Sequence, residues 1–145
     1  MYWEEVGNAG NNGNLSAQIG NVTITFPSAG IYRVEINGAF PRIYFNYTGD
    51  RKKIRSVEQW GDIVWTSMFG AFMGCSNITI PAQDAPDLSA VTDMGWMFYD
   101  AISFNEDIGD WDVSNVQNMY AVFYKASSFN QNIGGWDVSS VTNMQ

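Results

Sequence analysis

The residues in this chain best suited to chemistry are aspartates that recur at a constant spacing. Asp87, Asp112 and Asp137 recur with a 25-residue period. If equivalent positions of neighbouring segments lie side by side, their carboxylates come about 5 Å apart, the spacing of adjacent strands. Each carboxylate can then accept hydrogen bonds from the backbone of the turn that follows it. Alternatively, the column can bind Ca²⁺, an ion that prefers oxygen ligands, with Asp107 or Asp110 added.

A second candidate site consists of aromatic and amide side chains, several of which recur with the same 25-residue period. They are Trp111, Trp136, Tyr99, Tyr120, Tyr124, Asn105 and Asn130. Aromatic rings beside Asn and Asp side chains are typical of surfaces that hold a sugar or a peptide. The alternatives are that the tryptophans pack between neighbouring segments and that the asparagines hydrogen-bond between them. We therefore expect either a ligand surface or a repeated packing element.

Catalytic chemistry has little support in the sequence. There is no histidine, no Gly-x-Ser-x-Gly motif and no phosphate-binding loop. Carboxylate pairs such as Asp110 and Asp112 could act on a glycoside. However, equivalent positions in repeated segments lack the two different environments that an acid and a base need. We expect a non-enzymatic protein without a cofactor, apart from the possible Ca²⁺, and a carbohydrate-active enzyme is the most distant alternative.

The charge distribution limits the partners. Seven Lys and Arg residues face fifteen Asp and Glu residues, and residues 58–145 contain Lys125 alone against eleven acids. Such a surface repels nucleic acid and anionic lipid, because phosphate binding needs clustered cations. No apolar run approaches the length of about 20 residues needed to span a membrane. We therefore expect a protein or glycan ligand, no nucleic acid and no membrane insertion.

The 25-residue spacing extends through the second half of the chain. Residues 103–119 recur almost unchanged from Ser128, and weaker copies precede them, so we count four units at 54–78, 79–103, 104–128 and 129–145. A fixed period of this length is typical of stacked repeats. Val91, Met94, Phe98 and Ala101 have the spacing of a short helical stripe. The stretch 104–108 suits a short strand.

The first fifty residues have another character. Residues 7–14 contain only Gly, Asn and one Ala, which predicts a loop. Alternating β-branched and aromatic residues predict strands at 22–26, 31–36 and 42–47. We expect residues 1–50 to form an antiparallel β cap. Residues 51–145 would then form an α+β, leucine-rich-repeat-like, right-handed solenoid of about four coils, the last one truncated.

Two motifs carry a resemblance to known families. Ala-Phe-Met-Gly-Cys-Ser-Asn-Ile-Thr-Ile-Pro at 71–81 resembles the core of the BspA-type leucine-rich repeats. The pattern that begins at Met97-Phe98 and includes Trp-Asp-Val-Ser at 111–114 is similar to the repeat of bacterial surface lipoproteins. The resemblance covers residues 54–145. It implies a bacterial protein that is secreted or exposed at the cell surface and takes part in adhesion or binding.

From these observations we expect an extracellular binding or adhesion module that presents weak, repeated contacts. The alternative is a structural spacer or capping fragment that docks on further repeats, or self-associates through its C-terminal repeat.

Overall fold

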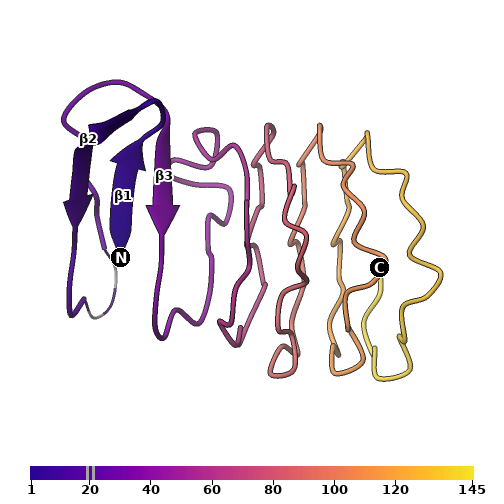
Figure 1. Ribbon diagram of the computed structural model, residues 1–145. Helices are drawn as coiled ribbons and strands as arrows, with labels where there is room; N and C mark the ends of the chain where they lie inside the picture. The colour runs from indigo at the N-terminus through magenta and orange to yellow at the C-terminus, as the bar shows by residue number, and fades with distance from the viewer. Residues whose placement is uncertain (19, 21) are drawn as a thin grey trace. The chain divides into compact units, whose positions relative to one another are not determined.

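The computed structural model describes residues 1–18, 20 and 22–145. The chain forms two compact units, unit 1 from Met1 to Gly38 and unit 2 from Ala39 to Gln145 (Figure 1). The boundary that we expected from the sequence lay after residue 50.

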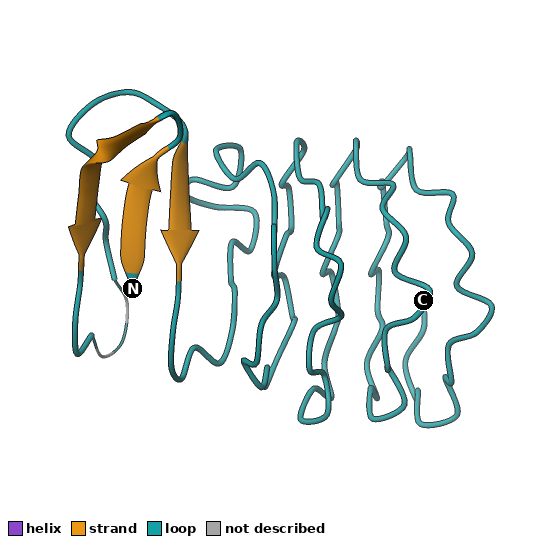
Figure 2. Ribbon diagram, in the orientation of Figure 1, coloured by secondary structure: helices purple, strands orange, loops and turns teal. Residues whose placement is uncertain are grey.

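Unit 1 contains a three-stranded antiparallel sheet (Figure 2). Its strands are β1 (Tyr2–Glu5), β2 (Asn8–Asn14) and β3 (Tyr32–Glu35), in the order β2-β1-β3. Three aromatic residues pack together in this unit. The rings of Phe26 and Tyr32 are stacked with centroids 4.1 Å apart, and Trp3 meets both edge to face. Aromatic packing of this kind stabilises a sheet that is too small to have a large core.

The prediction of a loop at residues 7–14 was wrong, because most of this stretch is strand β2. Trp3 pairs with Gly13 across the two strands. A Cβ atom on residue 13 would lie only 2.7 Å from the indole ring of Trp3. Glycine at this position therefore lets the large ring lie against the neighbouring backbone, so glycine has a packing role in this strand.

The predicted strands at 22–26 and 42–47 do not form, and the one predicted at 31–36 is the shorter β3. Within 22–26, the ring of Phe26 packs on Tyr32, but the segment does not pair as a strand. At 42–47, Asn46 and Tyr47 adopt positive φ angles of 43° and 61°. Left-handed residues turn the chain and end an extended segment.

In unit 2, successive stretches of chain, each about one repeat long, lie side by side (Figure 1). The backbone N–H of Met68 donates to Asp93, that of Met94 to Asn118 and that of Met119 to Asn143, at 2.8–3.0 Å. Isolated parallel bridges, including one between residues 93 and 118, connect the same neighbours. Regular contacts between stretches thus take the place of extended strands.

The prediction of an α+β leucine-rich-repeat-like right-handed solenoid was wrong. Residues 1–18, 20 and 22–145 contain no helix, and their only sheet is the three-stranded antiparallel sheet of unit 1. The helix expected over Val91–Ala101 consists of turns, and residues 104–108 do not form a strand.

The turns explain why the apolar spacing was misleading. The N–H groups of Met94, Trp96 and Phe98 donate to the neighbouring stretch, whereas those of Met97 and Tyr99 donate three residues back. Trp96 has a positive φ of 61°, which an α-helix does not allow. Consecutive turns bring residues three apart to the same side, as a helix does, so both structures produce the same apolar stripe.

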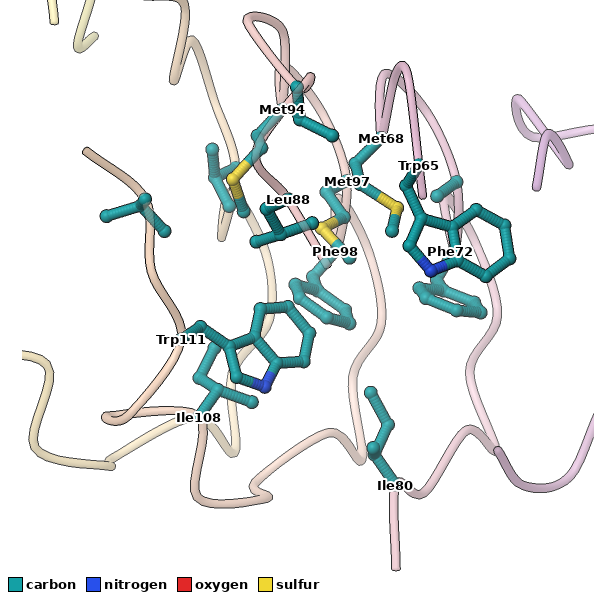
Figure 3. Close-up of a cluster of buried hydrophobic side chains, with 14 of the residues drawn as sticks. Trp65, Met68, Phe72, Ile80, Leu88, Met94, Met97, Phe98, Ile108 and Trp111 are labelled. Carbon is teal, nitrogen blue, oxygen red and sulfur yellow. The ribbon is translucent and has the colours of Figure 1, made fainter. Parts of the chain in front are cut away.

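The core of unit 2 is a column of aromatic rings surrounded by aliphatic and methionine side chains (Figure 3). Phe98 is fully buried at its centre, and its ring stacks with Phe72 at 5.6 Å, Phe123 at 5.8 Å and Phe104 at 4.0 Å. The side chains of Met68, Met94 and Met97 fill the space beside these rings. The 25-residue spacing therefore produces a continuous apolar interior.

The left-handed turns lead to a stability prediction at Lys125, which is exposed and has a φ of 61°. A left-handed residue with a side chain costs about 1–2 kcal/mol, and glycine loses only about 0.5–1 kcal/mol through its flexibility. We expect Lys125→Gly to unfold at a higher temperature than Lys125→Ala, by about 0.5–1 kcal/mol in free energy. Thermal or urea unfolding of the two variants measures this difference.

Ala90 is the matched control, because it is exposed and is not among the left-handed residues. There, Ala90→Gly should destabilise the protein. If glycine destabilises at both positions, position 125 is not strained.

Candidate functional site

The aspartate column forms a series of separate turn caps. Asp87, Asp112 and Asp137 each accept a hydrogen bond from the backbone N–H two residues later, at 3.0–3.1 Å. The hydroxyl of Ser114 also donates to Asp112 at 2.6 Å. These are the hydrogen bonds expected for Asx turns, which is the first of the two interpretations that the sequence left open.

The same hydrogen bonds determine the ionisation of the three carboxyls. At Asp112, the hydroxyl and then the backbone N–H of Ser114 hold the pKa of the carboxyl below its usual range, although desolvation and the like negative charge of Asp137 act to raise it. The equivalent serines lower the pKa values of Asp87 and Asp137 in the same way. Among residues 1–18, 20 and 22–145, no group of three or more acidic or Cys side chains is placed so that it could hold a metal ion.

The two candidate tryptophans lie mainly inside unit 2. Trp111 is only 4% exposed and meets Trp60 edge to face, with ring centroids 5.6 Å apart. Trp136 is partly buried, and its indole N–H donates to the carbonyl of Ile108 at 3.0 Å. Both residues therefore pack between neighbouring stretches, and neither belongs to an exposed aromatic surface.

The candidate asparagines make contacts between stretches. The side-chain oxygen of Asn105 accepts from the backbone N–H of Asn130 at 2.8 Å. A second amide ladder, which we had not singled out in the sequence, runs from Asn143 to Asn118 and from Asn118 to Asp93, at 3.0 and 2.9 Å. These amides maintain the register of neighbouring stretches.

The cysteine is not available as a nucleophile. Cys75 is fully buried, and burial raises the pKa of its thiol to about 12. It therefore stays protonated at neutral pH, whereas nucleophilic attack requires the thiolate.

Tyr99 and Tyr124 belong to a larger aromatic surface, which we call the aromatic face. Its rings are linked by ring-to-ring contacts of 5.3–6.5 Å. Its members are Tyr44, Tyr47, Phe69, Trp96, Tyr99, Tyr120 and Tyr124. None of the seven is buried, and Tyr44 and Tyr124 are 50% and 56% exposed. A contiguous exposed apolar surface of this kind marks an interaction site more often than scattered apolar residues do.

Cations line the aromatic face. The guanidinium of Arg42 lies 3.9 Å from the ring centre of Tyr44, and that of Arg51 lies 4.6 Å from Tyr47. The ammonium of Lys125 lies 5.6 Å from the ring of Tyr124. In these cation–π contacts the cation lies over one face of each ring, and all three tyrosines still remain exposed. Three of the six basic residues of unit 2 therefore contact this face in spite of the acidic composition of the chain.

Glycine at position 74 allows part of this arrangement. Gly74 has a φ of 75°, and a Cβ atom there would come within 2.8 Å of both Tyr47 and Arg51. Tyr47 also donates its hydroxyl to Asp100 at 2.9 Å, and this hydrogen bond raises the pKa of the phenol. Tyr47 is thus fixed by neighbours from three parts of the chain.

Sequence reasoning found three members of this face, Tyr99, Tyr120 and Tyr124, and missed the other four. Phe69 and Trp96 stack at 6.3 Å, but the two positions are not one 25-residue period apart, so a search at that period does not pair them. A signal was available for two of the others, because Tyr44 and Phe69 are 25 residues apart and their rings stack at 6.5 Å.

The Asx caps predict a pH-dependent effect at Asp112. Because its pKa is lowered in the folded state, its contribution is present above about pH 4, the unfolded value, and is lost as the pH falls through the folded pKa. Asp112→Asn should lower the melting temperature at pH 7, and the difference from the unsubstituted protein should shrink in acid. Asp62→Asn is the control, since Asp62 is exposed and hydrogen-bonds to no described side chain or backbone group. Equal losses for both variants at every pH would contradict the capping role.

Unit 2 contains the whole of the region that matches a known family. The comparison with curated proteins gave no match, and neither did the comparison with solved structures. In the part of the chain that the structure describes, no helix is long and apolar enough to cross a membrane. Residues 52–145 match the family described as "Mycoplasma protein of unknown function, DUF285". Since this match spans more than half of the 145 residues, the chain belongs to the DUF285 family.

Proposed function

We propose that the protein is a non-enzymatic binding module that recognises carbohydrate through its aromatic face. The observation that carries this proposal is the set of seven linked, unburied rings on unit 2. The resemblance of its motifs to repeats of bacterial surface proteins favours an extracellular setting and a role in adhesion.

The aromatic face differs from the aromatic core in a way that favours binding. Its rings make no ring-to-ring contact with the core rings around Phe98 among the described residues. Tyr120 and Tyr124 remain 37% and 56% exposed, although Tyr120 lies tilted against Trp96 and Tyr124 stacks on Tyr99. The exposed parts of these rings are apolar surface in contact with water. A ligand that covers this surface removes it from water, which favours binding.

Carbohydrate suits this surface better than an apolar partner does. One side of a sugar ring presents C–H groups that pack on an aromatic ring, and its hydroxyls need polar neighbours. The hydroxyls of Tyr44, Tyr120 and Tyr124 and the cations of Arg42 and Lys125 supply such neighbours. Because equivalent rings follow one another along the unit, an oligosaccharide can contact several of them, and weak contacts add.

A glycan array followed by titration tests this proposal. A ring contact is worth about 1 kcal/mol, which corresponds to about a fivefold change in affinity. We expect Tyr124→Ala and Tyr44→Ala each to weaken binding of an array hit by about this factor, with a small fall in melting temperature because each ring also contacts a neighbouring ring. Ile31→Ala, at a residue of unit 1 that is 53% exposed, should leave the affinity unchanged. An array without hits, or equal affinities for all three variants, would argue against carbohydrate binding at this face.

A further inference from the structure

Unit 2 has a cleft that shares no residue with the aromatic face. Its volume is about 290 Å³. Three successive stretches of the chain contribute to it, with Trp60 from the first, Ile80, Gln83 and Asp84 from the second, and Asp107, Asp110 and Trp111 from the third. Two indole rings and three carboxylates therefore enclose the same space.

The carboxylates of the cleft have free acceptor capacity. Asp110 accepts no hydrogen bond from any described residue, and Asp107 uses one oxygen for the backbone N–H of Gly109 at 3.0 Å. Asp84 is held differently, since both of its oxygens accept from the backbone at Trp60 and Gly61. Partial burial opposes ionisation of Asp84, but these N–H groups prevail and lower the pKa of its carboxyl. In the described part of the chain, the salt bridges of the Lys and Arg side chains are with Glu4 and Asp50, so no cation neutralises the cleft.

The indole N–H groups of the two tryptophans that line the cleft have no hydrogen-bond partner among the described residues. Trp60 is 3% exposed, and its buried Nε1 has no hydrogen-bond partner. Trp111 is 4% exposed, and its Nε1 donates to no described residue either. Figure 3 shows the Trp111 nitrogen on the ring edge that faces away from Leu88 and Phe98, on the side of Ile80, which lines the cleft. The Trp111 Nε1 is not among the buried unpartnered atoms, so it is open to the cleft, and a ligand oxygen there could accept from it.

The combination of free acceptors and free donors selects the kind of ligand. An ammonium or guanidinium group could pair with Asp107 and Asp110, but it has no lone pair for an indole N–H. No three acidic side chains of the described residues are placed to hold a metal ion. A hydroxyl group both donates and accepts, and adjacent hydroxyls on one ring can serve both needs.

We infer that this cleft binds a single sugar residue, whose hydroxyls donate to Asp107 and Asp110 and accept from the indole N–H of Trp111. A volume near the lower end of the ligand-pocket range, about 300 Å³, accommodates one sugar ring and no longer chain. The inference rests on the proposed function only for the class of ligand. It adds a second, polar site for one sugar residue, separate from the aromatic face on which a longer glycan would lie.

Indole N–H signals of protein with ¹⁵N-labelled tryptophan test the inference directly. The probes are the methyl glycosides of glucose, galactose and mannose, together with N-acetylglucosamine. We expect at least one of them to shift the Trp111 signal, and the Trp60 signal beside it, in a saturable manner. Trp65 is the internal control, because its buried Nε1 is also unpartnered but does not line the cleft.

Asp110→Asn is the main variant, since Asp110 is exposed and its substitution breaks no hydrogen bond with a described residue. A hydrogen bond to a charged group is worth about 1.5–3 kcal/mol, so affinity for the active sugar should fall at least about tenfold. Asp62→Asn should leave it unchanged. Tyr124→Ala should also leave the Trp111 shift unchanged, which separates this site from the aromatic face.

Three results would overturn the inference. One is the absence of a Trp111 shift with every sugar. Another is a shift with methylammonium but not with sugars, which would make the cleft a cation site. The third is a sugar response that survives Asp110→Asn but is lost in Tyr124→Ala, because the sugar would then bind only at the aromatic face. If the glycan array gives no hit but a sugar still shifts the Trp111 signal, carbohydrate binding at the aromatic face is refuted and sugar binding in the cleft is retained.

Discussion

The structure of unit 2 depends on backbone hydrogen bonds between neighbouring stretches of chain. Alternate N–H groups of each turn segment, such as those of Met94, Trp96 and Phe98, donate sideways to carbonyls of the stretch that follows. The N–H groups between them close turns within the same segment. Since buried backbone groups must be paired, this division of donors fixes how far one stretch can slide along the next.

A fixed register determines both the interior and the surface. Inside, it stacks Phe98 on Phe123 and places the methionines between the rings. On the outside, left-handed residues such as Trp96 redirect the chain, and exposed rings such as those of Phe69 and Trp96 then lie together in the aromatic face. The cleft follows from the same register, because Trp60, Asp84 and Trp111 meet only when three stretches lie in order. The two proposed binding surfaces thus depend on one scaffold of turns.

Part of this organisation could be predicted. The 25-residue spacing identified Phe104 and Phe129 as equivalent, and their rings stack at 5.6 Å. Asp112, placed before Val-Ser, was recognised as a possible turn cap. The secondary structure could not be predicted, since an apolar spacing of three and four is shared by helices and consecutive turns. The strand β2 was missed because its glycine serves the ring of Trp3, a contact between residues ten positions apart.

The sequence by itself determined which side chains are equivalent, which charges prevail and which catalytic groups are missing, since these depend only on residue type and spacing. Only the tertiary structure decided which rings lie inside and which outside. Trp111 and Tyr124 are both aromatic and both recur, yet one is 4% exposed and the other 56%. The physical reason is that consecutive turns bring residues three apart, such as Met94 and Met97, to the same buried side, and backbone angles such as the positive φ of Trp96 set the direction of the side chains between them. A spacing alone does not specify those angles.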